Sequence, residues 1–296
     1  MSFSWPKSEL SSDLTRKAIR QSVLESIHLA KSGHPGGSLS LVEILCAIFD
    51  GSFAHDQRNP EWKERDRFVL SKGHGVPALY AVYSQLGYFE ANEMKGLRKL
   101  GHFLQGHPDR DKFKLMEAST GSLGQGVSVA LGLALALRVQ FERGDLKRLP
   151  RVYCIVGDGE MQEGQVWECL MAAGKYKAGN LIFVLDRNMG QIDGSTEEVM
   201  PLNPLDEKLR AFNLNVQTVD GHDTSALKKY FSAIEVTPNA KSHFLIANTV
   251  KGKGVSFMEH QAKWHGSAPD KDQLSKALIE ILGHDSSNSP FGTLVG

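Results

Sequence analysis

Two apolar runs separated by one amphipathic stretch constrain the fold of this chain more than any other part of its sequence. The first run, RVYCIV, leads into the turn GDGE at residues 157–160, and the second run, LIFVLD, is followed closely by Asn188. The stretch between them places Val166 and Leu170 at helical spacing on one apolar face. Strand, helix and strand in this order form a right-handed crossover, in which parallel strands end at the same edge of a sheet.

The same alternation extends along most of the chain. It predicts an α/β fold with a parallel central sheet flanked by helices. A long helix rich in Gly and Ala, opened by residues 121–123, predicts a close neighbour within the chain or across a subunit interface. We expect one domain over residues 1–285 and a tail over residues 286–296. The other expected elements are strands at residues 67–71, 215–219 and 243–250 and helices at residues 12–31, 41–49, 77–86 and 224–235, the first capped by Ser12.

Composition and charge narrow the classes of partner. Lys and Arg total 34, as do Asp and Glu, so the formal net charge is zero. A neutral chain argues against nucleic acid or an anionic membrane as the main partner, since both attract basic proteins. Apolar runs of membrane-spanning length and an apolar signal-peptide core are both missing from the sequence. The odd set of Cys46, Cys154 and Cys169 has no metal-type spacing, and we interpret it as free thiols of a cytoplasmic protein.

Asp158 and Asn188 follow two strands that we expect to be neighbours. Adjacent strands lie about 4.8 Å apart, and two oxygens that share one Mg²⁺ ion at about 2.1 Å each lie roughly 3 Å from one another. Both side chains can therefore reach one hard cation at the carboxyl edge of the sheet, where α/β proteins bind ligands.

Other interpretations of the GDG turn compete with a metal site. A dinucleotide-binding loop needs a third glycine at fixed spacing, but the next glycine is Gly164, and Asp158 would repel a pyrophosphate without an intervening cation. The sequence has no Walker loop. A tight turn with a purely structural role fits the spacing equally well, so that alternative stays open.

Seven short motifs, in order, resemble transketolase, a thiamine diphosphate-dependent family. They are SGHPGG, RDRFVLSKGHG, QGHPD, GSLGQG, GDGEMQEG, DRNMGQIDG and WHGSAP, and they extend over residues 32–269. Other thiamine diphosphate enzymes share the GDG turn and the later asparagine but not these histidine motifs. A full transketolase also has a pyrimidine-binding and a C-terminal domain. The resemblance therefore implies the N-terminal, diphosphate-binding subunit of a split transketolase.

This resemblance implies a metal site at the strand ends. Asp158, Asn188 and the backbone carbonyl of Gly190 would bind Mg²⁺, with Ca²⁺ as a substitute, and the ion would bridge the two phosphates of thiamine diphosphate. Gly159 and the start of the following helix would offer N–H groups to the same phosphates.

Two further segments would hold the organic part of the cofactor. Gly121, Ser122 and Leu123 match the family's loop on the aminopyrimidine side. Ile192 would form an aliphatic wall beside the thiazolium ring, although an ordinary core isoleucine would explain it equally well.

Four histidines acquire roles from the same resemblance. His74 would contact the diphosphate, and His265 would contact both diphosphate and substrate. His34 would contact sugar hydroxyls, and His107 the reacting end of the donor. Imidazole suits such work because it can donate, accept or carry a proton near neutral pH. A lone histidine between glycines is typical of an ordinary turn, and we interpret the other seven of the 11 histidines as structural.

The family's assembly implies a partner chain. Glu163 and Glu168 match acids at its dimer interface that link two active sites, although surface helix acids need no such role. The glutamate that activates the cofactor lies in the pyrimidine-binding domain, for which we find no counterpart in this sequence. We therefore expect a partner subunit that carries this domain, an α2β2 heterotetramer, and no activity of this chain alone.

The implied reaction transfers a two-carbon ketol unit from a ketose phosphate such as xylulose 5-phosphate to an aldose phosphate. One alternative is the same chemistry on an unusual sugar of a dedicated pathway. Another is a non-catalytic subunit that binds the cofactor and serves assembly, against which the intact metal ligands and histidines argue.

Three positions depart from the family's pattern. Ser122 stands where proline is usual, which predicts a less rigid loop. Arg187 replaces an acidic or polar residue and adds positive charge near the expected phosphate site. Gly190 replaces a bulkier aliphatic residue, which predicts a more mobile turn.

Overall fold

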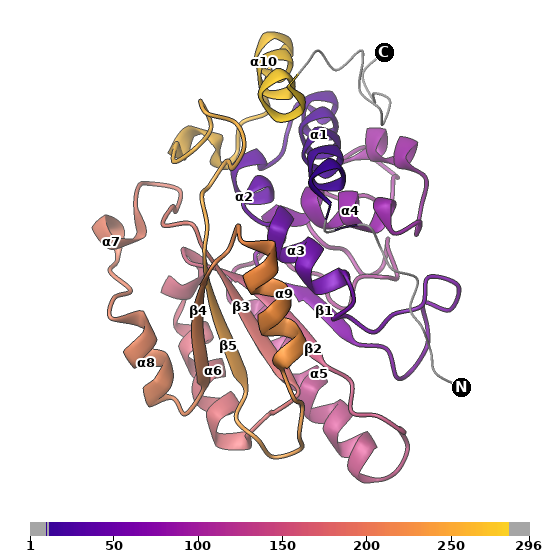
Figure 1. Cartoon of the computed structure of the whole chain (residues 1–296), viewed down its shortest axis with the longest axis vertical. Coiled ribbons are helices and arrows are strands. Elements are labelled where there is room, and N and C mark those ends of the chain that lie inside the picture. The colour runs from indigo at the N-terminus through magenta and orange to yellow at the C-terminus, as the bar shows by residue number, and fades with distance from the viewer. Residues whose placement is uncertain (1–9, 11, 284–296) are drawn as a thin grey trace.

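The structure, a computed structural model, describes residue 10 and residues 12–283 (Figure 1). The tail expected at residues 286–296 lies outside the described residues. Five strands form one parallel sheet in the order β1-β2-β3-β5-β4. The predicted α/β fold with a parallel sheet is thus confirmed. The strands are β1 (Arg67–Leu70), β2 (Val152–Gly157), β3 (Leu181–Arg187), β4 (Asn215–Asp220) and β5 (His243–Asn248).

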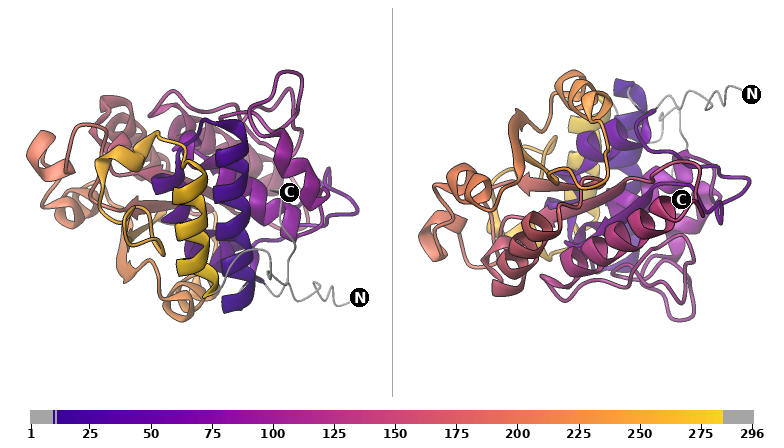
Figure 2. Two further views of the ribbon diagram at one scale, coloured as in Figure 1. Left: turned by 90° about the horizontal axis from the view of Figure 1, so that it is seen from above. Right: turned by 90° about the horizontal axis from the view of Figure 1, so that it is seen from below.

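Helices cover both faces of the sheet, so its central strands are buried throughout (Figure 2). One layer and its core cluster contain α1 (Asp13–Ala30), α2 (Pro35–Leu39), α3 (Val42–Phe49), α4 (Val76–Gln85), α9 (Thr224–Ala233) and α10 (Lys271–Leu282). The opposite layer contains α5 (Gln125–Glu142), α6 (Gly164–Tyr176) and α8 (Leu205–Ala211). The short α7 (Thr196–Val199) follows the loop after β3. Short 3-10 helices are η2 (Gly73–Gly75), η3 (Ala91–Gly96), η4 (Glu160–Gln162) and η5 (Ala262–His265).

The register of the central strands positions the site. Gly157 of β2 pairs with Asp186 of β3, so the chain leaves both strands at the same level. The carboxyl ends of the strands then meet α2, where Lys72 donates to the carbonyl of Gly37 at 3.1 Å and Ser40 donates to Asp186 at 2.6 Å.

Local signals explain where several helices begin. The Ser12 hydroxyl accepts the N–H of Thr15 at 3.1 Å, which confirms the predicted cap of α1. The helix expected from residues 121–123 begins instead at Gln125, because Gly124 adopts a left-handed φ of 81°. The sequence analysis did not predict α2, α7, α8 or α10.

The face of α5 turned away from the sheet is exposed. Val129 and Val139 are 41% and 39% exposed, and a Cβ added to Gly132 would meet open space. The close neighbour expected from the small residues of this helix lies on its other side, within the chain: Ala130 and Ala134 are fully buried, and a Cβ on Gly126 would lie 2.6 Å from Ser71 Oγ.

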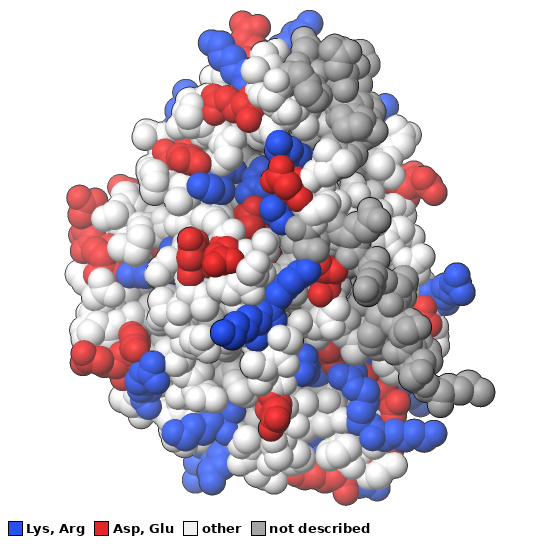
Figure 3. All heavy atoms as spheres, viewed as in Figure 1, with Lys and Arg blue, Asp and Glu red and all other residues white. Residues whose placement is uncertain are grey.

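The cysteines and the distribution of charge can be compared with the expectations from composition. The three cysteines are free and buried, as expected, and burial raises the pKa of Cys46 and Cys169 to about 12. Acidic and basic side chains are interspersed over the face drawn in Figure 3. Among residues 10 and 12–283, no helix combines the length and apolar character needed to cross a membrane.

Candidate active site

A cavity of about 370 Å³ at the carboxyl edge of the sheet brings most of the predicted site residues together. Ser122 and Glu168, both exposed, do not line it. The predicted residues that line it are His34, His74, His107, Gly121, Leu123, Asp158, Gly159, Glu163, Asn188, Gly190, Ile192 and His265.

Asp158 and Asn188 lie side by side at the floor of this cavity, only 1% and 7% exposed. The Asp158 carboxylate accepts the N–H of Gly159 at 3.0 Å and the N–H of Met189, the residue after Asn188. Asn188 Oδ1 accepts the N–H of Gly190 at 3.0 Å. The predicted meeting of the two strand ends is therefore present in the fold.

Asp186, which the sequence analysis did not single out, fixes the orientation of the Asn188 amide. Asn188 Nδ2 donates to Asp186 Oδ2 at 3.0 Å, so Oδ1 faces the other way as an acceptor. Asp186 is fully buried and also accepts from Ser40, Thr249 and the ammonium of Lys72. Burial opposes its ionisation, but the charge and hydrogen bond of Lys72 outweigh burial and lower the pKa of Asp186.

The environment of Asp158 fits a cation. Burial, reinforced by the charge of Asp186, raises the pKa of Asp158 from 3.8 to about 6, and the nearby Arg187 and Lys72 offset this only in part. The positive charge around Asp158 thus falls short of what its ionised form needs, and a bound divalent ion would supply the remainder. The described residues hold no group of three or more His, Cys, Asp or Glu placed around one ion. The available donors are a carboxylate, an amide oxygen and backbone carbonyls, which suit Mg²⁺ or Ca²⁺.

The four predicted histidines form one cluster around His34. The ring centroid of His34 lies 5.4 Å from those of His74 and His265 and 5.9 Å from that of His107. Burial, together with neighbouring positive groups, lowers the pKa of His34 and His265 to about 4. Burial likewise lowers the pKa of His74 and His107. At neutral pH the cluster therefore consists of uncharged imidazoles that donate and accept hydrogen bonds.

Two lysines of the cavity were also missed at the sequence level. Lys72 precedes the GHG turn, and Lys251 lies just beyond β5; both line the cavity. Lys251 Nζ lies 3.1 Å from His265 Nδ1, and burial together with Lys72 lowers the pKa of Lys251 to about 8. The site therefore presents two ammonium groups close to its two buried carboxylates.

Gly190 and Gly121 permit close approaches. A Cβ on Gly190 would lie 2.9 Å from Cδ of Lys251, so the missing side chain gives Lys251 its path into the cavity. Gly121 has φ 134°, and a Cβ there would lie 2.9 Å from the His107 ring. Glycine at position 190, the departure from the family's pattern, thus leaves room for the Lys251 side chain. The sequence analysis predicted only a more mobile turn there.

Glu160 ties three loops together and was likewise missed. It is 2% exposed and lines the cavity. Its carboxylate accepts from the Ser71 hydroxyl at 2.5 Å, the Gly124 N–H at 2.9 Å and the Gly157 N–H at 3.1 Å. The loop at residues 121–123 is thereby held against the GDG turn.

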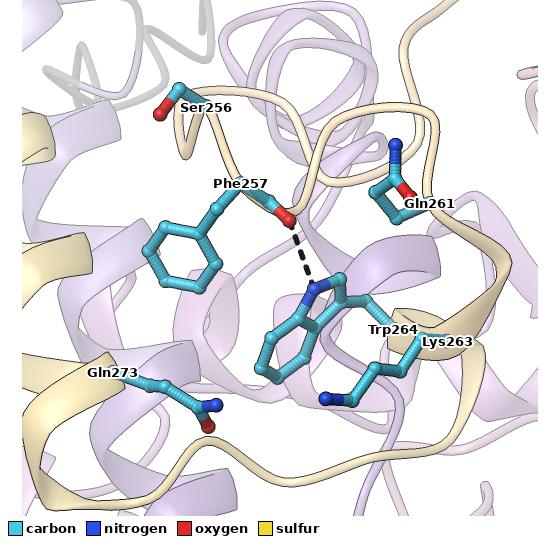
Figure 4. Close-up of a pocket in the computed structure, with 6 residues that line it drawn as sticks. All are labelled: Ser256, Phe257, Gln261, Lys263, Trp264 and Gln273. Atoms are coloured by element: carbon cyan, nitrogen blue, oxygen red, sulfur yellow. Dashed lines mark hydrogen bonds between the residues drawn. The ribbon is translucent and has the colours of Figure 1, made fainter.

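His265 reaches the cavity from a segment fixed by Trp264. The indole N–H of Trp264 donates to the Phe257 carbonyl at 3.0 Å (Figure 4). Trp264 is 4% exposed, and its indole forms part of the wall of an open surface pocket of about 400 Å³ that also involves Lys263 and Gln273. This anchor accounts for the tryptophan of the WHGSAP motif.

The surroundings of Arg187 and Ile192 show more of what each residue does than the sequence alone. Arg187 does not line the cavity; its guanidinium donates to Thr196 and Glu197 and lies 3.7 Å from Asp158. The expected positive charge is therefore close to Asp158, but its hydrogen bonds are made with Thr196 and Glu197 and not across the cavity. Ile192 is 64% exposed at the cavity mouth, which excludes an ordinary core position.

Known proteins are similar to this chain in sequence and in fold. The model of the family "Transketolase, thiamine diphosphate binding domain" matches residues 11–292. The chain is 42% identical to the SqwG subunit of the 6-deoxy-6-sulfo-D-fructose transketolase of Clostridium sp. (strain MSTE9), covering 93% of this chain and 98% of that one. It is 38% identical to one of the named subunits of the apulose-4-phosphate transketolase of Phocaeicola vulgatus, covering 92% and 93%.

Longer relatives match over part of their length. Human transketolase is 36% identical, with 92% of this chain and 42% of that enzyme covered. The solved transketolase of Leishmania mexicana superposes with a TM-score of 0.85 at 29% identity, covering 93% of this chain and 42% of that one. The chain therefore spans less than half of these longer proteins.

Proposed function

This chain belongs to the transketolase family, and from that membership we propose that it is the diphosphate-binding subunit of a two-chain transketolase. The observation that carries the proposal is the cavity, in which the paired strand ends, the four histidines and two lysines converge. Coverage of 98% and 93% of two relatives that are named as subunits supports the two-chain form.

In this proposal Asp158, Asn188 and the Gly190 carbonyl bind Mg²⁺, and Ca²⁺ fits the same oxygens. Lys72 and Lys251 contribute positive charge beside the phosphates of thiamine diphosphate. Gly159 offers its N–H to these phosphates. Thiamine diphosphate, when bound, supplies the chemistry that cleaves the carbon–carbon bond beside a ketose carbonyl and carries the two-carbon unit to an aldose.

The residues of this chain bind the cofactor and the sugar and orient them for that reaction. His74 and His265 face the diphosphate, with His265 also near the sugar, and His34 and His107 face the sugar itself. As neutral imidazoles they donate to and accept from hydroxyl groups without adding charge to the site. The loop at Gly121, Ser122 and Leu123 supports the aminopyrimidine side.

The parts of the active site that this chain lacks would come from a partner subunit. We propose a partner subunit with the pyrimidine-binding domain and its glutamate, joined in an α2β2 heterotetramer. Ile192 and Glu163 at the exposed mouth, with Glu168 further along α6, are then covered by neighbouring subunits. A cytoplasmic location and a single domain over residues 1–285 belong to the same proposal.

The relatives favour an unusual sugar over xylulose 5-phosphate as the donor. Their names specify 6-deoxy-6-sulfo-D-fructose and apulose 4-phosphate, each with its own enzyme made of separate subunits. We therefore prefer the alternative of a dedicated pathway to our first expectation. A purely structural role is disfavoured, because the cavity retains every predicted metal ligand and histidine.

The test co-expresses this chain with the protein encoded beside its gene and follows ketol transfer with thiamine diphosphate and Mg²⁺. Donors should include xylulose 5-phosphate, sulfofructose and apulose 4-phosphate. We expect turnover only by the pair, loss in Asp158→Ala and retention in Asp206→Ala, a half-buried aspartate of α8 that does not line the cavity. Full activity of the isolated chain would refute the two-chain form, and an inactive pair that binds cofactor would refute these sugars.

A further inference from the structure

A buried polar cluster lies behind the cavity without lining it. Glu43 of α3 is 6% exposed and accepts two hydrogen bonds from the Arg20 guanidinium, at 2.8 and 2.9 Å. His222, between β4 and α9, contacts the same carboxylate through Nδ1 at 2.9 Å, and Arg16 lies 3.6 Å away. Burial opposes ionisation of Glu43, but the His222 hydrogen bond and Arg20 outweigh it and lower the pKa of Glu43.

The second nitrogen of His222 determines its tautomer. The backbone N–H of Val250 donates to His222 Nε2 at 2.8 Å. Nε2 must therefore be an acceptor, and the ring proton resides on Nδ1, where it is donated to Glu43. Both ring nitrogens are engaged, and the imidazole connects a buried carboxylate with one backbone amide.

This amide belongs to the residue before Lys251. Arg20, the other partner of Glu43, donates through Nε to the Lys253 carbonyl at 3.2 Å. The two groups that Glu43 orients therefore hold the backbone on both sides of Lys251. The same segment makes one further contact with α2, from the Gly252 N–H to the Gly36 carbonyl at 3.0 Å.

We propose that His222 is a positioning residue: oriented by Glu43, it fixes the Val250 amide and thereby the entry of Lys251 into the cofactor cavity. Histidine is required because the task needs a donor and an acceptor on opposite sides of one rigid ring. The inference rests on the proposed function in one respect, the role of Lys251 beside the diphosphate.

Two substitutions separate the two bonds of His222. His222→Asn can retain the donor to Glu43, because its amide nitrogen matches the reach of Nδ1, but it cannot reach Val250. His222→Gln can retain an acceptor for Val250, because its longer side chain matches the reach of Nε2, but it loses Glu43. These variants therefore form a matched pair in which each keeps one contact.

We expect His222→Asn to weaken binding of thiamine diphosphate with Mg²⁺ about 10- to 100-fold, the range for groups that orient a ligand-binding residue. His222→Gln should bind with nearly the affinity of the wild type. Calorimetric titration of the co-expressed complex measures both. The reverse order, or equal affinity in both variants, would overturn the proposal, since His222 would then serve only Glu43 or packing.

Two readouts need no cofactor. Amide hydrogen exchange at Val250 and Lys251 should accelerate in His222→Asn but not in His222→Gln. In the wild type, nitrogen chemical shifts of labelled histidine should show His222 protonated at Nδ1 alone. Protonation at Nε2 would overturn the proposal even if both variants failed to fold.

These readouts also separate this inference from the proposed function. A wild-type complex that does not bind thiamine diphosphate would refute the proposed function, while the tautomer and exchange data would still decide whether His222 holds the loop.

Discussion

At the scale of single residues, the site places charge where it is unfavourable in the empty protein. Asp158 is buried, faces the carboxylate of Asp186, and has a pKa raised to about 6. Because the folded pKa exceeds the unfolded value of 3.8, its ionised form destabilises the fold above pH 6, and this effect disappears below pH 4. Such a group is suited to function rather than to stability.

Asp158→Asn should therefore stabilise the cofactor-free protein while abolishing tight binding. The uncharged amide removes the cost of the buried ionised carboxylate, which is on the order of 1 to 3 kcal/mol. The gain in stability is smaller than this, because asparagine accepts fewer hydrogen bonds than the carboxylate. We expect a net gain of about 1 kcal/mol in the free energy of unfolding at pH 7.5, measured with urea. Affinity for thiamine diphosphate with Mg²⁺ should fall on the order of 100-fold. A less stable variant would contradict this account of the carboxylate.

The same residue predicts how binding depends on pH. Between pH 4 and pH 6 a proton and the metal compete for Asp158, so Mg²⁺-dependent affinity should fall about tenfold per unit below pH 6. His34 and His265 have pKa values of about 4 and stay uncharged over most of this window. Titrations at half-unit intervals test the slope. Asp158→Asn provides the control, because its affinity should fall less steeply over this range, where only the terminal phosphate of the cofactor still takes up a proton.

At the scale of elements, buried ion pairs and hydrogen bonds align the strand ends. Lys72 follows β1 and Asp186 lies in β3, and their contact crosses the end of β2 between them. Both side chains are essentially inaccessible, at 1% and 0% exposure. Breaking such a pair leaves one charge buried without compensation.

Lys72→Met should destabilise the protein by about 3 to 5 kcal/mol, because Asp186 loses its ammonium partner. Urea unfolding measures the loss. Lys253→Met is the matched control, since its partly exposed ion pair with Glu259 contributes at most about 1 kcal/mol. The double variant Lys72→Met, Asp186→Asn should recover part of the stability. A loss below about 1 kcal/mol in Lys72→Met would show that the pair is unimportant to the fold.

The elements were largely predictable, because local patterns specify them. Apolar runs and helical spacing identified all five strands and the helices α1, α3, α4, α5, α6 and α9. The start of α5 was misjudged, since the left-handed φ of Gly124 is a property of the folded turn. Helix α10 was overlooked although Asp270 and Gln273 form a capping box, a signal present in the sequence.

The site was predictable only where motifs mark it. Asp158, Asn188 and four histidines stand in recognisable motifs, and the fold brings them to one cavity. Lys251 and Asp186 escaped notice because their importance depends on what lies opposite them after folding. Nothing in the local sequence around Lys251 reveals that Gly190, 61 positions earlier, leaves room for its side chain.

At the scale of the whole molecule, α5 leaves apolar side chains exposed on one of its faces. Val129 and Val139 are exposed beside the open space over Gly132, on the sheet face opposite α1 and α9. We expect this face to join two copies of the chain in the proposed heterotetramer.

Val129→Glu should therefore reduce the assembled complex to a smaller species while leaving the single chain stable within about 0.5 kcal/mol, as for other surface substitutions. Sedimentation of the co-expressed pair measures the mass. Ile279→Glu on α10, where the isoleucine is 47% exposed, is the matched control and should leave the mass unchanged. An unaltered mass for Val129→Glu would exclude this face as the contact between copies.

The contrast between the floor and the mouth of the cavity bears on how such a chain can evolve. At the floor, Asp186 has four polar partners, so a first change at any of them leaves a buried group unsatisfied. At the mouth, the Ile192 side chain is mostly exposed, so a substitution there costs the fold of this chain little. We therefore expect proteins descended from such a chain to change their sugar specificity through single substitutions at the mouth. The floor, where the proposed cofactor binds, should change much more slowly.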